Sequence, residues 1–277
     1  MSLTFDTVDN KIAEAEFFLQ KMCGCSHGKD FNWYFSAFLS AARTSTLALQ
    51  RFKDAIPGFQ AWYEPHRQRM ATNDLAKAFL DMRNDHVHGG PYPVSGSMSH
   101  GRTVEHYFRQ NDPRKSSAPG TPQVVQASTE YFVDLLEIVH DCYVKLGVHF
   151  DPQQYYTKEN YPGRDIDAAE CEVCGWVCTS LIKEGFTKDD RWNELRGRVA
   201  ECFINHLFRA YLDKITPQPV VPEHCADFKF SEEDEGWTHV PAGYSSVAEY
   251  RRKFRGTTTV GLRGPKPKTK TQRQNSK

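Results

Sequence analysis

Residues 31–53 read FNWYFSAFLSAARTSTLALQRFK, and this stretch decides the fold. Aromatic and aliphatic side chains recur at helical spacing and also fill much of the remaining positions, which is typical of a helix buried on more than one side. Asp30 directly precedes the stretch and is a suitable N-cap residue. We therefore expect a central helix over roughly residues 31–53.

Helical patterns also lie on both sides of this segment. They cover residues 5–22, a helix capped by Asn73 and stopped at Gly89-Gly90, residues 123–148, and a later pair over about 165–184 and 190–214. The stretch 89–122 is rich in Gly, Pro and Ser, which indicates a long surface excursion with a short hairpin around Arg102–Phe108.

The predicted fold class is all-α, with three parts. Residues 1–150 form a helical bundle, residues 151–215 form an additional helical pair that packs on it, and residues 216–277 form an irregular region that ends in a disordered basic tail.

Charge is balanced over the chain but not along it. The 35 basic and 35 acidic residues cancel, whereas residues 251–277 carry ten basic residues and no acidic one. A basic tail attracts RNA electrostatically, which makes Arg251, Arg252, Lys253 and Arg255 candidate RNA-binding residues. A solubilising end, or a contact with the acidic run at 232–235, explains the tail equally well.

The sequence predicts a cytoplasmic protein without a membrane segment. Its first residues lack the basic and apolar regions of a secretory signal, and no apolar run approaches the ~18 residues of a membrane helix. The eight cysteines are then expected to be reduced thiols.

Chemistry is concentrated at the end of the fourth helical segment, Arg83-Asn84-Asp85-His86-Val87-His88. Arginine is a permanent forked cation suited to phosphate oxygens, and histidine exchanges a proton near neutral pH. RNA carries its own nucleophile, the 2′-hydroxyl. Cleavage of RNA therefore needs proton removal and charge stabilisation, and no metal or other cofactor.

This motif resembles the R-x4-6-H signature of the HEPN superfamily, and residues 11–18 and 35–43 resemble one bacterial branch of HEPN-like proteins. The similarity covers roughly residues 5–148. It implies a helical bundle that forms a homodimer, with two copies of the signature facing each other. It also implies a ribonuclease of toxin–antitoxin or anti-phage systems, or an inactive binding domain. On this match Arg83 and His88 are the signature pair, and Asn84 is the adjacent polar residue.

Alternatives remain within the motif. Positions 83 and 88 lie about 140° apart around a straight helix, so His86 competes with His88 for the catalytic role. Arg83 could instead pair with a neighbouring carboxylate such as Asp85, and His88 could cap the helix. Arg43, in the apolar central helix, reaches the site or, more in keeping with its burial, pairs with an acid on a neighbouring helix.

A zinc site is a weaker alternative. Cys171, Cys174, Cys202 and His206 could supply four ligands, but small cysteines buried between two packed helices explain the spacing without a metal.

The leading hypothesis is a homodimeric endoribonuclease that leaves a 2′,3′-cyclic phosphate, with RNA as substrate and an antitoxin or other protein as a partner. The second hypothesis is a non-catalytic module that binds RNA or protein and dimerises.

Overall fold

The computed structural model describes six stretches of the chain, residues 4–87, 94–100, 103–108, 123–217, 226–231 and 236–241. The fold is mostly helical, as predicted. The chain divides into two compact units, one formed by Met1–Tyr155 with Ala200–Gln218 and the other by Tyr156–Val199 with Pro219–Lys277. The predicted domain boundaries at residues 150 and 215 stay predictions.

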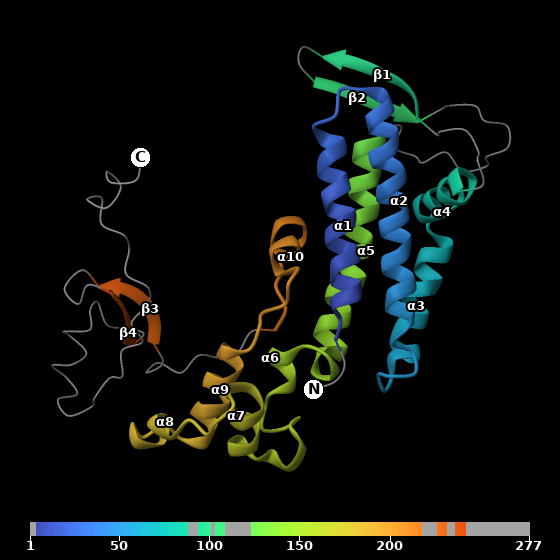
Figure 1. Cartoon of the computed structure of the whole chain (residues 1–277). Coiled ribbons are helices and arrows are strands. Elements are labelled where there is room, and N and C mark those ends of the chain that lie inside the picture. The colour runs from blue at the N-terminus through green and yellow to red at the C-terminus, as the bar shows by residue number, and fades with distance from the viewer. Residues whose placement is uncertain are drawn as a thin grey trace, which may run out of the picture. The chain divides into compact units, whose positions relative to one another are not determined.

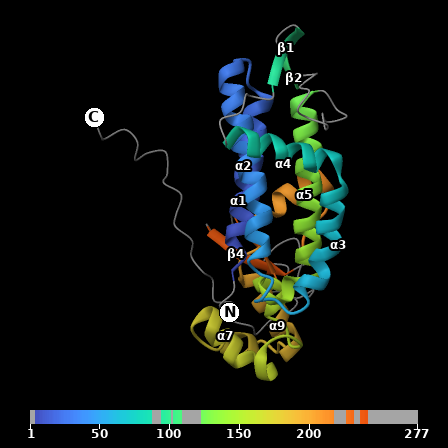
Figure 2. The ribbon, with the colours of Figure 1, turned by 90° about the vertical axis from the view of Figure 1, so that its right-hand side faces the viewer.

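Three long helices form the body of the first unit. They are α1 (Asp6–Cys23), α2 (Gly28–Gln50) and α5 (Val124–Leu146), which run side by side along their length (Figure 1). Two shorter helices, α3 (Phe59–Thr72) and α4 (Asp74–Val87), complete the bundle, and α4 crosses the long helices at a steep angle (Figure 2).

The core confirms that α2 is buried on more than one side. Phe31, Phe35 and Phe38 are almost completely shielded from solvent, and they meet Phe79 of α4 and Phe132 of α5 in one apolar cluster. Each fully buried phenylalanine contributes about 1.5–3 kcal/mol relative to an exposed one. This cluster therefore provides much of the free energy that holds the bundle together.

Two predicted N-caps have different outcomes. Asn73 caps α4 as expected, because its side-chain oxygen accepts the Ala76 amide hydrogen bond at 3.1 Å. The prediction that Asp30 caps α2 is wrong, since α2 already begins at Gly28. Asp30 lies in the first turn, where its carboxylate favours the positive end of the helix.

The predicted hairpin is present. Strand β1 (Val94–His100) pairs antiparallel with β2 (Thr103–Phe108). The hairpin is anchored to the bundle by the buried ring of His106, which stacks on Phe31 with ring centroids 3.7 Å apart. Its Nε2 atom also lies 3.1 Å from the carbonyl oxygen of Cys25 in the α1–α2 turn.

The helical pair predicted over 165–184 and 190–214 is wrong in its extent. Four helices occupy this stretch: α7 (Ile166–Cys174), α8 (Thr179–Lys183), α9 (Lys188–Arg198) and α10 (Asn205–Leu212). The first break occurs because Gly175 adopts a left-handed backbone with φ of 84°, which ends α7. Of the four, α10 belongs to the first unit, where it packs on α5.

A short helix, α6 (Pro152–Tyr155), follows the 3-10 turn η1 (Gly147–His149) after α5. In the second unit, the 3-10 turn η2 (Pro162–Arg164) precedes α7. This unit also contains a hairpin that the sequence did not predict, in which β3 (Ala226–Ser231) pairs antiparallel with β4 (Gly236–Pro241). None of the helices among the described residues has the length and apolar character needed to cross a membrane.

A buried ion pair stabilises the second unit. Arg191 of α9 donates to both carboxylate oxygens of Glu170 on α7, at 2.9 and 2.7 Å. Glu170 also accepts the backbone N–H of Cys178 at 2.6 Å. The side chains of Arg191 and Glu170 are only 5% and 1% exposed, so Glu170 depends on Arg191 for compensation, whereas Arg191 also pairs with Asp167 at 2.5 Å.

Arg191→Leu therefore destabilises the second unit strongly. It leaves Glu170 as a buried, uncompensated charge, for which a loss of about 3–5 kcal/mol is expected. Lys158→Met is the matched control, because it removes an exposed cation paired with Asp189 and is expected to cost at most about 1 kcal/mol. Hydrogen exchange over residues 156–199 measures both effects, and equal protection in the two variants would contradict the expectation.

Candidate functional site

Residues 83–87 of the sequence motif lie in the last two turns of α4, and Arg83 is its best-described member. Arg83 is half-buried, and its guanidinium donates a hydrogen bond of 3.3 Å to the side-chain oxygen of Asn84. The Nε atom of Arg83 is buried and has no hydrogen-bond partner among the described residues. Asn84 thus partly orients the guanidinium, a group whose fork suits an anionic ligand such as phosphate.

The histidines of the motif cannot be placed with Arg83. Helix α4 ends at Val87, one residue before the predicted end, so His88 falls outside the described residues. His86 lies in the last turn of α4, and only its backbone is described. Asp85 is exposed on the same turn. The assignment of a catalytic histidine therefore stays a prediction.

Arg43 occupies the middle of α2, and its NH1 group donates to the hydroxyl of Thr46 at 3.2 Å. No ion pair joins Arg43 to a carboxylate among the described residues, so the predicted acidic partner is not found there. Its charge instead acts on two tyrosines. Burial raises the pKa of Tyr131 to about 12 and also raises the pKa of Tyr63, while Arg43 opposes both shifts.

A polar cluster that the sequence reasoning missed joins α3 to α5. Asp141 accepts hydrogen bonds from Trp62 at 2.7 Å, and its carboxylate lies 3.0 Å from Nε2 of His66 and 3.1 Å from Nζ of Lys145. Burial alone would raise the pKa of Asp141, but these partners outweigh it and lower the pKa below its usual value.

The same two helices continue the contact toward α4. Arg69 lies 3.7 Å from Glu137, and Asn73 donates to Asp134 at 3.0 Å. The spacing of the acidic residues on α5 matches one helix face and could have predicted a polar partner helix. This arrangement orients His66 through a carboxylate, but its evident role is to hold α3 against α5.

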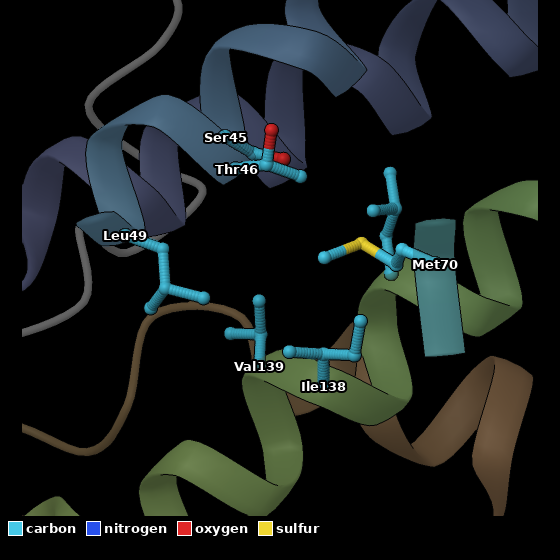
Figure 3. A pocket seen from close by; sticks show the side chains of 7 residues that line it. Ser45, Thr46, Leu49, Met70, Ile138 and Val139 are labelled. Carbon is cyan, nitrogen blue, oxygen red and sulfur yellow. The ribbon is translucent and has the colours of Figure 1, made fainter. Parts of the chain in front are cut away.

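A cavity between α2, α3 and α5 is too small for a substrate. Ser45 and Thr46 approach from α2, Met70 from α3, and Ile138 and Val139 from α5 (Figure 3). Its volume is about 10 Å³, close to the minimum for one water molecule.

The zinc alternative finds no support in the geometry. Among the side chains that the structure describes, no group of three or more His, Cys, Asp or Glu residues is arranged to hold a metal ion. Cys171 is exposed rather than packed between helices, and Cys202 is buried in the turn before α10. Cys174 ends α7 half-buried, and His206 is exposed on α10.

The candidate RNA-binding residues of the tail, Arg251, Arg252, Lys253 and Arg255, lie outside the described residues, as does the acidic run at 232–235.

Comparison with known families assigns the first unit's helical bundle. The family described as bacteriophage lambda protein ea47 matches residues 5–145, which include α1 to α5. The chain belongs to the bacteriophage lambda protein ea47 family. No curated protein and no solved structure matches it significantly.

The membership in the ea47 family corrects the predicted HEPN resemblance. The two assignments concern almost the same residues, 5–148 and 5–145, and the family match does not identify HEPN. The error has a physical origin, because an arginine and a histidine five positions apart near a helix end arise often by chance. Apolar helical stripes, the other part of the resemblance, are common to many bundles.

The ea47-family bundle also contains a buried carboxyl group in an unusual state. Asp9 of α1 accepts a hydrogen bond of 2.7 Å from the Tyr143 hydroxyl, while its other oxygen is buried and finds no hydrogen-bond partner in the described part of the chain. Burial raises the pKa of Asp9 to about 7, against the opposing effect of Tyr143 and with smaller contributions from Asp6 and Asp151. Asp9 is therefore partly protonated near neutral pH.

This shift makes the stability of the bundle depend on pH. Because Asp9 keeps its proton in the folded state up to about pH 7 but loses it near pH 4 when unfolded, stability falls as the pH rises through that window. The pKa shift corresponds to a change in the free energy of unfolding of roughly 4 kcal/mol at most, at about 1.4 kcal/mol per pH unit.

Asp9→Asn is expected to remove this pH dependence and to be more stable than the wild type at pH 8. Urea unfolding at pH 5 and pH 8 measures it, with the exposed Asp81→Asn of α4 as control. An unchanged gap between Asp9→Asn and wild type at both pH values would refute it.

Proposed function

We propose that the chain is a metal-independent endoribonuclease whose site lies at the end of α4. The observation that supports this is the pairing of Arg83 with Asn84, which orients a half-buried guanidinium suited to a phosphate. Arg83 binds the scissile phosphate, and Asn84 holds the arginine in place. The proposal rests on this chemistry and no longer on a resemblance to another family.

The reaction uses the substrate's own nucleophile. His88 removes the proton from a 2′-hydroxyl, whose oxygen then attacks the adjacent phosphorus. The bond from phosphorus to the 5′-oxygen breaks, and the leaving oxygen takes up a proton. The products are a 2′,3′-cyclic phosphate and a 5′-hydroxyl, while Arg83 stabilises the charge that develops on the phosphate.

The proposed assembly is a homodimer in the cytoplasm. A second copy of the chain completes the site by bringing another motif to the same RNA strand, and the basic tail with Arg251, Arg252, Lys253 and Arg255 raises the local concentration of RNA. An antitoxin or other protein that masks the site, and a role in anti-phage defence, are part of the same proposal.

One observation favours a second candidate, a non-catalytic module that binds RNA or protein. Phe17 and Trp33 are 51% and 53% exposed on α1 and α2. The ammonium groups of Lys21 and Lys29 lie 5.2 and 5.3 Å from the centres of these rings. Exposed aromatic rings next to cations are suited to stacking with nucleobases or to a protein interface.

Single-stranded RNA incubated with pure protein and a chelator tests the first proposal. Cleavage should yield cyclic phosphate ends, and a 2′-deoxy substitution at the cleaved nucleotide should block it. His88→Ala is expected to reduce the rate by roughly 10²–10⁴-fold, the range for loss of a general base, while RNA binding is retained. Arg83→Lys should also reduce it, because lysine lacks the fork.

His27→Ala and Arg51→Ala are controls on the same bundle and should cleave at the wild-type rate. His86→Ala tests whether His86 or His88 is the general base. Intact RNA with the wild-type protein in the absence of a masking partner, or full activity in both His88→Ala and His86→Ala, would sink the nuclease and favour the binding module.

A further inference from the structure

A groove of about 430 Å³ lies between the C-terminal end of α2 and the first half of α3. This volume falls within the range of sites that hold a small molecule or one segment of a polymer. Polar or charged groups come from Gln50, Lys53, Gln60, Tyr63, Glu64 and Arg67, but together with Phe59 and Ala61 these residues present more apolar than polar surface to the groove. It is separate from the end of α4 and shares none of the motif residues.

Two cations of the groove are available to a ligand. Lys53 is 58% exposed, and its ammonium lies 3.9 Å from the Asp54 carboxylate, which makes a weak pair. Arg67 is 60% exposed and holds Glu64 through Nε at 2.8 Å and NH2 at 2.7 Å. The third guanidinium nitrogen of Arg67, NH1, has no acceptor among the described residues and can bind an anion.

The wall of the groove supplies a further donor. Tyr63 is only 7% exposed, and its oxygen accepts a hydrogen bond from Gln50 at 3.1 Å, which leaves its own O–H free to donate. Arg43 and Arg67 both lower the pKa of Tyr63 against the larger effect of its burial. Positive charge therefore acts on this hydroxyl from the bundle interior and from the surface.

The carboxylate of Glu64 in the groove is already paired with a cation. Hydrogen bonds from Arg67 and then Gln68 lower the pKa of Glu64 to about 2, so it is ionised and engaged at neutral pH. The first turn of α3, to which Gln60 and Ala61 belong, adds the positive end of a helix without an acidic residue in that turn. Each of the two cations thus has a carboxylate beside it, so the groove carries no net charge, and what it offers an anion are the remaining donors of Lys53 and NH1 of Arg67.

We propose that this groove binds the phosphate backbone of a single-stranded nucleic acid, with Lys53 and Arg67 on neighbouring phosphates and Tyr63 donating a hydrogen bond. The identification of the strand as RNA rests on the proposed function, whereas the site itself does not. The groove binds one part of the strand at a place separate from the motif at the end of α4. This contact determines the direction from which the rest of the strand reaches the motif. Two separate cations suit a repeating phosphate chain better than a single compact anion.

Binding of a short fluorescein-labelled oligodeoxythymidylate tests the groove apart from catalysis, since this strand lacks the 2′-hydroxyl and cannot be cleaved by the proposed reaction. Lys53→Gln with Arg67→Gln should weaken binding roughly tenfold at low salt. The slope of log affinity against log salt should fall by about 1.4, from roughly 0.7 for each phosphate contact of a single strand. Lys77→Gln, which removes an exposed lysine of α4, is the matched control and should reduce neither.

Glu64→Gln is expected to increase the affinity for the oligonucleotide, a result that misfolding cannot produce. Removal of this carboxylate frees Arg67 and should raise the affinity for the same oligonucleotide. Unchanged affinity and salt slope in the double variant, or a loss of affinity in Glu64→Gln, would overturn the proposal that the groove binds a nucleic-acid strand. Equal competition by adenosine monophosphate at matched phosphate concentration would also overturn it, because the ligand would then be a free nucleotide. Groove binding without RNA cleavage would refute the nuclease alone.

Discussion

Phe35 of α2 packs against Phe79 of α4 and Phe108 of β2, with ring centroids 5.9 Å apart in each pair. This contact joins three segments that are distant in the sequence, and the rest of the bundle depends on it. A helix with apolar residues around much of its surface can satisfy them only when other elements cover several of its sides. Burial of α2 therefore determines where α4 lies, and with it the position of Arg83.

The parts of the fold that were predictable depend on local chemistry. The apolar density of residues 31–53 predicted a buried helix, and Asn73 predicted the start of α4, because both signals lie within a few residues. The break at Gly175 was missed because an isolated glycine is tolerated in many helices. The β3–β4 hairpin was missed although β3 alternates apolar and polar residues, because each strand has only six residues and β4 lacks the same alternation.

The candidate site also has a part that local sequence predicts and a part that it does not. The Arg83–Asn84 pair was predictable because adjacent residues carry it, whereas the link from His66 to Asp141 joins positions 75 residues apart. Pairings of that kind depend on how α3 lies against α5, and no local pattern fixes this. The same limit explains the false resemblance, since a short motif on generic helices says little about which bundle contains it.

The distribution of charge connects these observations. Charge is nearly balanced over residues 1–150, which carry 16 acidic and 15 basic residues. The ion pairs on α3 and α5 use their cations internally, as Arg69 and Lys145 do with Glu137 and Asp141. A polyanion therefore needs cations that keep unused donors. Lys53, which is only weakly paired with Asp54, and NH1 of Arg67 meet this condition. Placement of an anionic strand thus follows from these few donors and not from a large basic surface.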